Sequence, residues 1–273
     1  MIASPSSTVA RSLNPDFDLI EAVAGTGNGV VDMWEASPVR LDSNVPRTGE
    51  IIDILFPGNP LLCCGWDRHR FDTRPCNHWY KLDDLQFIVP NPMTARSGLT
   101  RSRKPSAHAL TNTGPRRFLI LEFDFDAGRS AEEARLLTNL LIEGRDERDL
   151  CAALLLHLAQ MAPLVLAVYS GGKSLHGWFY CDGRPERTLE RFMQYAVSLG
   201  VDKASWISSQ FTRMPDGLRS RSTRQTVYFF NPSVLKSVTE SRTVNHFATF
   251  ASIRKCPVAI PCSDGFAAIK NAA

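Results

Sequence analysis

The 273-residue chain has little net charge, because its 31 Lys and Arg residues stand against 28 Asp and Glu residues and leave a formal charge of +3. This balance excludes a protein that binds polyanions through overall charge alone, so the local distribution of charge matters. The chain also lacks the composition of collagen-like, coiled-coil or wholly disordered proteins, since 44% of its residues are hydrophobic and 22% are charged. It has room for one large globular domain or two small ones.

The sequence contains no unbroken apolar run long enough to span a membrane and no N-terminal stretch with the pattern of a secretory signal peptide. Its most apolar segment, residues 151–169, is interrupted by His157, Gln160 and Pro163 and is better explained as a helix followed by a buried strand. The seven cysteines are an odd number, which indicates free thiols. We therefore expect a cytoplasmic protein with no membrane partner.

Cysteine spacing also gives no zinc site. Cys63, Cys64, Cys76 and His78 carry suitable ligand atoms. Two adjacent cysteines, however, lack the spacing that lets both thiolates reach one tetrahedral ion. We predict buried free thiols and no structural zinc.

The order of the predicted elements favours an α+β fold. Residues 1–15 are rich in Ser, Ala and Pro and read as a flexible arm, and residues 16–116 give weak signals for an N-terminal α/β elaboration. We then predict strands over 118–125, 164–169, 175–180 and 226–230, and helices over 130–141, 147–161 and 185–199, the first with a capping box between Ser130 and Glu133. Such an order predicts helices packed on one face of a mixed or antiparallel sheet. Residues 16–273 are predicted to form a single domain, with the clearest pattern of elements over 117–232 and a C-terminal extension over 233–273.

One long segment has no acidic residue. Between Leu85 and Leu121 there is no Asp or Glu, but there are six cations: Arg96, Arg101, Arg103, Lys104, Arg116 and Arg117. A second basic cluster, with only Asp216 nearby, consists of Arg219, Arg221 and Arg224. A solvated surface loop is one explanation, but unpaired cations also attract polyanions, and phosphate neutralisation supplies most of the affinity for nucleic acids. We predict that both clusters contact nucleic acid.

Three acidic residues alternate with phenylalanines at the end of the strand predicted over 118–125. Glu122, Asp124 and Asp126 share one face if the strand continues through them, because residues two apart point the same way. Neighbouring carboxylates repel one another unless a cation lies between them, and hard oxygen ligands suit Mg²⁺ or Mn²⁺. From these residues alone, a polar solvent-facing edge strand is the alternative.

A glycine turn, Ser170–Ser174, follows the next strand. It is not a Walker A loop, since Ala167 stands where that motif needs its leading glycine and a strand follows in place of a helix. Its bare backbone amides, its two serines and Lys173 are still suited to phosphate oxygens. His176 comes just inside the following strand, where a structural histidine is the alternative reading.

Taken in this order, the motifs resemble those of the archaeo-eukaryotic primase superfamily, the primase-polymerases of plasmids, phages and other mobile elements. The acidic-hydrophobic-acidic motif of that family is similar to Glu122-Phe123-Asp124, or to Asp124-Phe125-Asp126. The family's second motif is a small residue, then any residue, then histidine, and Ser174-Leu175-His176 is similar to it. The third motif is a hydrophobic residue followed by aspartate, to which Val201-Asp202 is similar. The segment Phe211–Pro215 is similar to the family's Arg-x-Pro-Gly segment, except that Asp216 replaces the glycine. The resemblance covers about residues 117–232, which it implies carry the catalytic motifs; we call these residues the catalytic segment.

The resemblance implies a metal-dependent, template-directed nucleotidyltransferase, either a primase or a DNA polymerase, with an RRM-like sheet in its catalytic core. It implies a two-metal site for Mg²⁺ or Mn²⁺ held by Glu122, Asp124 and Asp202, with Asp126 as an alternative ligand and His176 as a further catalytic residue. The implied nucleotide-binding residues are Ser170, Lys173, Ser174, His176 and Arg213. The implied partners are nucleoside triphosphates, single-stranded or primed DNA and, because no helicase domain follows the motifs, a separately encoded helicase. Replication of a mobile element or DNA repair is the expected setting.

A second hypothesis is a non-catalytic RRM-like module that binds single-stranded nucleic acid with the same sheet. Its base-stacking residues would be Trp178, Phe179, Tyr180, Tyr228 and Phe229. Aromatic residues in strands more often pack in the core, and the ordered acids and histidine favour the enzyme.

Overall fold

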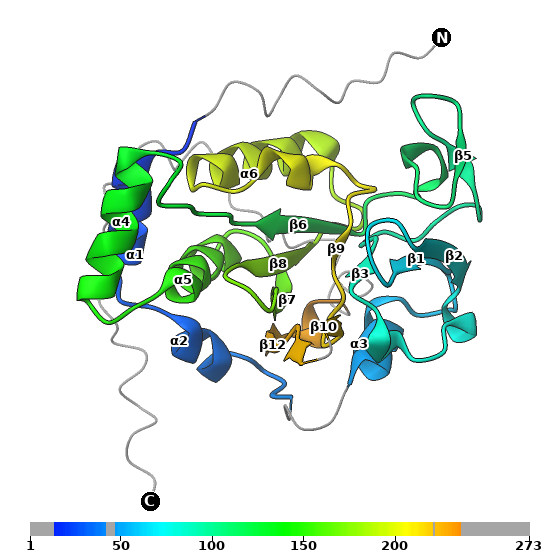
Figure 1. Cartoon of the computed structure of the whole chain (residues 1–273), viewed down its shortest axis with the longest axis horizontal. Helices are drawn as coiled ribbons and strands as arrows, with labels where there is room; N and C mark the ends of the chain where they lie inside the picture. Colours follow the sequence, from blue (N-terminus) through cyan, green and yellow to red (C-terminus); the bar gives the residue numbers. More distant parts are fainter. Residues whose placement is uncertain (1–13, 42–46, 221, 236–273) are drawn as a thin grey trace, which may run out of the picture.

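A computed structural model of the chain describes residues 14–41, 47–220 and 222–235. These residues form an α+β structure with six α-helices and two four-stranded antiparallel sheets, as the element order predicts (Figure 1). Arg221, most of the predicted N-terminal arm and most of the predicted C-terminal extension lie outside the described residues.

The central sheet consists of the four strands predicted from the catalytic segment. They are β6 (Phe118–Glu122), β7 (Leu164–Tyr169), β8 (Leu175–Tyr180) and β12 (Val227–Phe230), in the order β12-β7-β8-β6 with every neighbouring pair antiparallel. The prediction that the first strand continues to residue 125 is wrong. Glu122 already lies opposite His176, near the start of β8, so the following residues have almost no partner strand left on that side.

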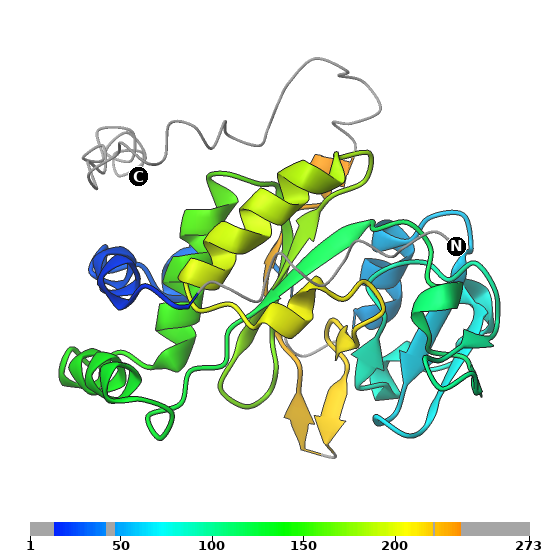
Figure 2. The ribbon, with the colours of Figure 1, turned by 90° about the horizontal axis from the view of Figure 1, so that it is seen from above.

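Helices α5 (Glu147–Ala159) and α6 (Glu186–Ser198) pack on one face of this sheet, and α1 (Phe17–Ala24) and α2 (Val30–Glu35) pack against α5 (Figures 1 and 2). Helix α4 (Ala131–Ile142) begins at Ser130, whose Oγ accepts a hydrogen bond from the backbone N–H of Glu133 at 3.1 Å. The other half of the predicted capping box is wrong. The Glu133 carboxylate accepts a hydrogen bond from the backbone N–H of Asp126 at 2.7 Å instead, which ties the start of α4 to the end of the acidic motif.

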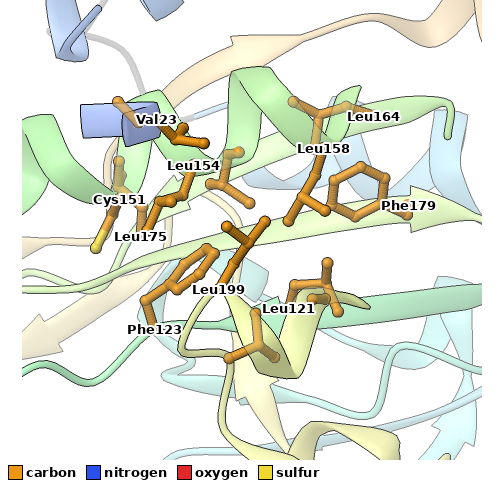
Figure 3. Close-up of a cluster of buried hydrophobic side chains, with 14 of the residues drawn as sticks. Val23, Leu121, Phe123, Cys151, Leu154, Leu158, Leu164, Leu175, Phe179 and Leu199 are labelled. Atoms are coloured by element: carbon orange, nitrogen blue, oxygen red, sulfur yellow. The ribbon is translucent and has the colours of Figure 1, made fainter. Parts of the chain in front are cut away.

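The larger hydrophobic core lies between the sheet and these helices. Leu121 of β6 and Phe179 of β8 point into it, together with Leu154 and Leu158 of α5 (Figure 3). Residues of α5 are buried on most sides because the helix lies between the sheet and the N-terminal helices. This explains why its sequence is nearly continuous in apolar residues.

The opposite face of the sheet is covered by a second layer. Phe118, Ile120, Trp178 and Tyr180 pack there against α3 (Thr48–Leu55) and against a second sheet. That sheet has the order β2-β1-β3-β9, formed by β1 (Leu61–Gly65), β2 (Phe71–Pro75), β3 (Phe87–Ile88) and β9 (Thr212–Arg213). Strand β9 is the edge strand of the second sheet on the side of the central sheet (Figure 1), and its Thr212 contacts His176 of β8.

Two small hairpins complete the described structure. One joins β4 (Gly98–Leu99) to β5 (Pro105–Ser106) within the segment that has no acidic residue, and the other joins β10 (Leu218–Ser220) to β11 (Thr223–Arg224). No helix in the described ranges is long and apolar enough to cross a membrane.

The adjacent cysteines of β1 point to different hydrophobic clusters. Cys64 packs in the core between the two sheets and Cys63 in a small cluster on the other side of its strand. Both are free thiols, and burial raises the pKa of Cys63 to about 11. Two neighbouring side chains that point in opposite directions cannot readily ligate one ion.

Replacing Leu154 with Ala should test the assignment of α5 to the core. Leu154 is fully buried, so we expect the free energy of unfolding to fall by about 2–5 kcal/mol. Leu141 on α4 is 69% exposed and serves as the matched control, for which Leu141→Ala should change it by less than about 0.5 kcal/mol. Urea denaturation followed by circular dichroism measures both, and equal losses would contradict the assignment.

Candidate active site

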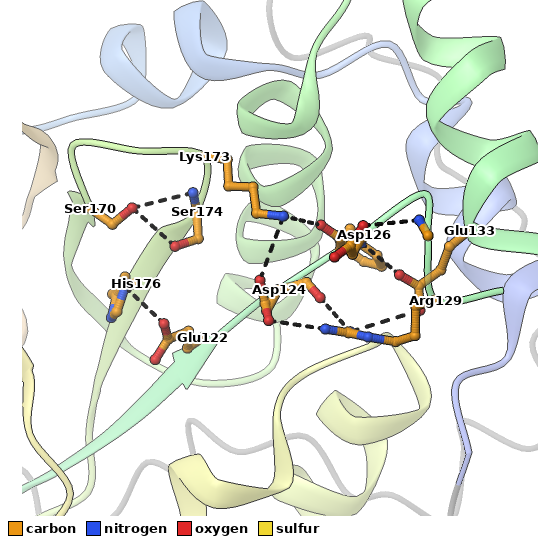
Figure 4. A network of polar contacts seen from close by, with 11 residues as sticks. Glu122, Asp124, Asp126, Arg129, Glu133, Ser170, Lys173, Ser174 and His176 are labelled. Carbon is orange, nitrogen blue, oxygen red and sulfur yellow. Dashed lines mark hydrogen bonds and ion pairs between the residues drawn. The ribbon is translucent and has the colours of Figure 1, made fainter.

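Glu122 and His176 form a directly opposed pair at the end of the central sheet. They are cross-strand partners on β6 and β8, and His176 Nε2 lies 3.3 Å from Glu122 Oε1 (Figure 4). On its other side, His176 Nδ1 is hydrogen-bonded to Thr212 Oγ1 of β9 at 3.1 Å. The pair therefore lies where the two sheets meet.

His176 is a neutral histidine. Burial, together with the positive charges of Arg213 and Arg219, lowers its pKa to about 3. Within the described structure its Nε2 makes no hydrogen bond, because the 3.3 Å contact with Glu122 lacks suitable geometry. Leaving a buried polar atom without a hydrogen bond costs free energy, so a ligand group that bonded to Nε2 would recover that cost.

The pKa of Glu122 is raised to about 7, chiefly by burial. Arg213 opposes this shift, whereas the negative charges of Asp202 and Asp124 add to it. The three carboxylates are thus close enough to repel one another, and a bound cation would relieve that repulsion.

Asp202 reaches the site through the exit of α6. Gly200 has a φ of +93° and lies against the ring of Phe125, where a Cβ atom would come within 2.9 Å of the ring. The chain then makes an isolated bridge between Val201 and Phe123, and the backbone N–H of Asp202 donates to the carbonyl oxygen of Glu122 at 2.9 Å. The predicted first and third motifs are joined by the backbone itself.

Asp124 and Asp126 lie beyond the end of β6, but the side chains of residues 123–126 still alternate between buried and exposed. Phe123 and Phe125 are buried with stacked rings 6.0 Å apart, while both aspartates are exposed. Asp126 accepts a hydrogen bond from the N–H of Gly128 at 2.9 Å, which commits one of its oxygens to the turn before α4. Asp124 and Asp202, by contrast, line one cavity of about 470 Å³ between α1, α4 and the end of α6.

The donor atoms of Glu122, Asp124 and Asp202 suit a divalent cation, since all are hard carboxylate oxygens near the same strand end. In the described residues, however, no three His, Cys, Asp or Glu side chains are placed to share one ion. Asp124 is instead directed to Arg129 and Lys173 (Figure 4), with an ion pair of 3.0 Å to Arg129. The carboxylates are chemically suited to a cation, but Asp124 would have to turn away from Arg129 to share one ion with Glu122 and Asp202.

The glycine turn lies beside this group. Ser170 Oγ and Ser174 Oγ are 3.1 Å apart, and Lys173 Nζ donates to the carbonyl oxygen of Phe125 at 3.0 Å. The guanidinium of Arg219 lies over the turn and donates to the carbonyl oxygen of Ser170 at 3.0 Å. A Cβ atom on Gly172 would overlap that guanidinium, so the glycine leaves room for an arginine from a distant part of the sequence.

Three further residues of the site were missed by sequence reasoning. Arg68, in the turn between β1 and β2, lowers the pKa of Glu122, and Thr212 holds His176. Arg129 contacts Asp124. The run Arg68-His69-Arg70 is a basic signal in the sequence, but no local pattern links it to Glu122 and Asp124, more than fifty residues away.

The predicted nucleic-acid-binding cations occupy different environments. Exposed side chains around the β4–β5 hairpin belong to Arg96, Arg101, Arg103 and Lys104. Arg116 instead stacks on Trp206 and donates to its carbonyl oxygen at 2.8 Å, and Arg117 pairs with Asp182 at 3.3 Å. Arg224 donates to the carbonyl oxygen of Asp216, whose φ is +58°.

Comparisons with known proteins add little to this geometry. No protein-family model matches the sequence, and neither does any curated protein sequence. Among solved structures, the chain is similar to the polymerase domain of Mycobacterium tuberculosis Ligase D in complex with DNA. The identity is 17% over 87% of this chain and 92% of that chain, with a TM-score of 0.31. A TM-score this low does not establish a shared fold, and we base no argument on it.

Replacing Gly171 with Ala should test how closely the β10–β11 hairpin approaches the glycine turn. Gly171 has a φ of +74°, and a Cβ atom there would lie 2.9 Å from Thr223 Cγ2. Gly183 is the matched control, because its φ is +72° and no atom lies within 4 Å of its Cβ position. We expect Gly183→Ala to cost about 1 kcal/mol of unfolding free energy and Gly171→Ala about 1–3 kcal/mol more, measured by urea denaturation. Equal costs would contradict the described packing.

The protonation of His176 can be followed by NMR of its imidazole ring. A histidine takes up its proton near pH 6.5 in the unfolded chain, whereas folded His176 does so only near pH 3. Its neutral burial therefore contributes stability above pH 6.5 that is lost progressively as the pH falls towards 3. We expect the ring nitrogens to keep the shifts of a neutral imidazole from pH 8 to about pH 5, apart from a small change near pH 7 as the neighbouring Glu122 carboxylate titrates. Conversion to the nitrogen shifts of an imidazolium near pH 6.5 would show that the ring is accessible to solvent.

Proposed function

We propose that the protein is a divalent-metal-dependent nucleotidyltransferase that acts on DNA, as a primase or DNA polymerase. The observation that supports this best is the convergence of Glu122, His176 and Asp202. They come from three separate segments, yet Glu122 touches His176 across the sheet and accepts a hydrogen bond from the Asp202 backbone. The proximity of the ordered acid, histidine and acid motifs supports the proposal.

In the proposed reaction a 3′-hydroxyl oxygen attacks the α-phosphorus of a nucleoside triphosphate, and pyrophosphate leaves. Glu122, Asp124 and Asp202 would hold Mg²⁺ or Mn²⁺, which neutralises charge on the reacting oxygens when bound. The carboxylates would act as ligands of the cation in their ionised form. The pKa of about 7 for Glu122 is set largely by burial and by its acidic neighbours, and a cation nearby favours its ionised form.

Positive side chains surround the place where the triphosphate would lie. Burial and the nearby positive charge of Arg219 lower the pKa of Arg213, so the two guanidinium groups repel each other. An anionic phosphate would relieve this repulsion. Neutral His176 offers its unpaired Nε2, and Lys173 lies at the tip of the adjacent turn. These groups would stabilise negative charge on the phosphates by electrostatics and hydrogen bonds.

Template and primer DNA are assigned to the exposed cations. Arg101, Arg103 and Lys104 lie in the β4–β5 hairpin and are fully available to a phosphate backbone. His108, just after that hairpin, stacks on Phe211, the residue before β9. The hairpin is thereby connected to the strand that contacts His176.

The burial of the central sheet weighs against the non-catalytic binding module. That hypothesis needs an open face with aromatic residues, but both faces are covered by hydrophobic clusters. Trp178 and Phe179 are fully buried, and Tyr180 is 6% exposed. Base stacking on these rings would require the sheet to be uncovered.

Replacing Asp124 or Asp202 with Asn should separate catalysis from DNA binding. We expect primer extension with Mn²⁺ to fall at least about a hundredfold in each variant, because a lost cation ligand removes several kcal/mol of transition-state stabilisation. Template affinity, measured by fluorescence anisotropy, should stay within about twofold because cations supply it. Glu132→Gln, at an exposed acid in the first turn of α4, is the matched control and should keep full activity.

The outcome for Asp126→Asn identifies the ligands of the acidic motif. Because the Asp126 carboxylate caps the Gly128 turn, we expect a smaller loss of extension than for Asp124→Asn. Absence of extension or dinucleotide synthesis by the unmodified protein, with any nucleotide mixture in Mg²⁺ or Mn²⁺, would overturn the proposed function.

A further inference from the structure

The carboxylate of Asp124 already has cationic partners within the protein. Its Oδ2 lies 3.0 Å from the Arg129 guanidinium, and its Oδ1 lies 4.0 Å from Lys173 Nζ (Figure 4). Glu122 and Asp202 have no such ion pair with either cation in the described structure. Asp124 is therefore the carboxylate of the candidate metal site whose charge is neutralised internally.

Arg129 is held in place by several contacts that all belong to one short segment. It also donates to the backbone carbonyl oxygen of Asp124 and lies 3.8 Å from the buried carboxylate of Glu133. Glu133 in turn accepts a hydrogen bond from the N–H of Asp126. The loop between β6 and α4 thus folds back so that an arginine five residues after Asp124 returns to it.

We propose that Arg129 is a built-in counter-ion that competes with the divalent cation for Asp124. This inference rests on the proposed function, since it assumes that Asp124 is a metal ligand. A cation can engage Asp124 only after its carboxylate leaves the guanidinium. Arg129 therefore weakens the binding of metal alone, and it holds the acidic motif neutral until a cation replaces it.

The strength of the contact is suited to displacement. The side chains of Asp124 and Arg129 are both 53% exposed, and an exposed ion pair is weak compared with a buried one. Lys173 lies farther away and is shared with the carbonyl oxygen of Phe125. An incoming phosphate that attracts Lys173 would remove the second counter-ion, so nucleotide and metal would assist each other at this carboxylate.

The decisive experiment is a titration of the full chain with Mn²⁺ alone. Binding is measured by isothermal calorimetry and, independently, by the decrease of the electron paramagnetic resonance signal of free Mn²⁺. We expect Arg129→Gln to bind Mn²⁺ about three- to tenfold more tightly than the unmodified protein, because a competing positive charge is removed. Arg129→Lys keeps the charge and should bind with nearly unchanged affinity. Thermal denaturation checks that each variant is folded.

The matched control is Arg135→Gln. Arg135 is an exposed arginine of α4 that pairs with Glu21 at 2.9 Å, so its removal also deletes one positive charge from the same helical region. It should change Mn²⁺ affinity by less than about twofold, because the charge is not in contact with the acidic motif. An equal effect of both variants would overturn direct competition in favour of general electrostatics.

A double-mutant comparison tests whether the effect passes through Asp124. In the Asp124→Asn background, Arg129→Gln should no longer tighten Mn²⁺ binding. Persistence of the full effect in that background would overturn the inference. If the unmodified protein binds Mn²⁺ and Asp124→Asn weakens it, but Arg129→Gln does not strengthen it, only this inference fails. If the unmodified protein, Arg129→Gln and Asp124→Asn all bind no Mn²⁺, the proposed function itself fails.

Discussion

The candidate site depends on the junction where the end of β6 meets the exit of α6. The backbone hydrogen bond from Asp202 to Glu122 and the bridge between Val201 and Phe123 extend the strand by a single residue pair from a distant segment. Gly200 permits this approach because its positive φ turns the chain away from the helix, against the ring of Phe125. Without that junction, the acids of the first and third motifs would belong to separate surfaces.

Around this junction, burial and charge oppose one another. Glu122 and His176 lie where two packed layers meet, and burial favours the neutral form of both. Arg213 experiences the same penalty and is also repelled by Arg219. Groups of both signs are therefore held close together without complete mutual neutralisation. Such an arrangement is unfavourable for stability alone but suits a site that receives a cation and a polyanion together.

The elements of the catalytic segment were predictable because each is encoded by local patterns. Strands β7 and β8 are short apolar runs on either side of a glycine turn, and α4 begins at a serine cap. The second sheet was hardly predictable, since β3 and β9 are two-residue strands paired across more than a hundred residues of sequence. Strands this short carry no periodicity, and only the packing against α3 and the central sheet stabilises them.

The same division applies to the site residues. The sequence by itself determined that Glu122 and Asp124 are acids separated by a buried phenylalanine, that His176 follows a glycine turn and that Asp202 follows a helix. Tertiary structure decided that Glu122 faces His176, that Thr212 and Arg68 join them, that Arg116 is occupied by Trp206 and that Asp124 turns to Arg129. The physical reason is the distance along the chain over which each interaction acts. Alternation and capping act between near neighbours along the chain, whereas charges interact with whatever the fold brings within a few ångströms.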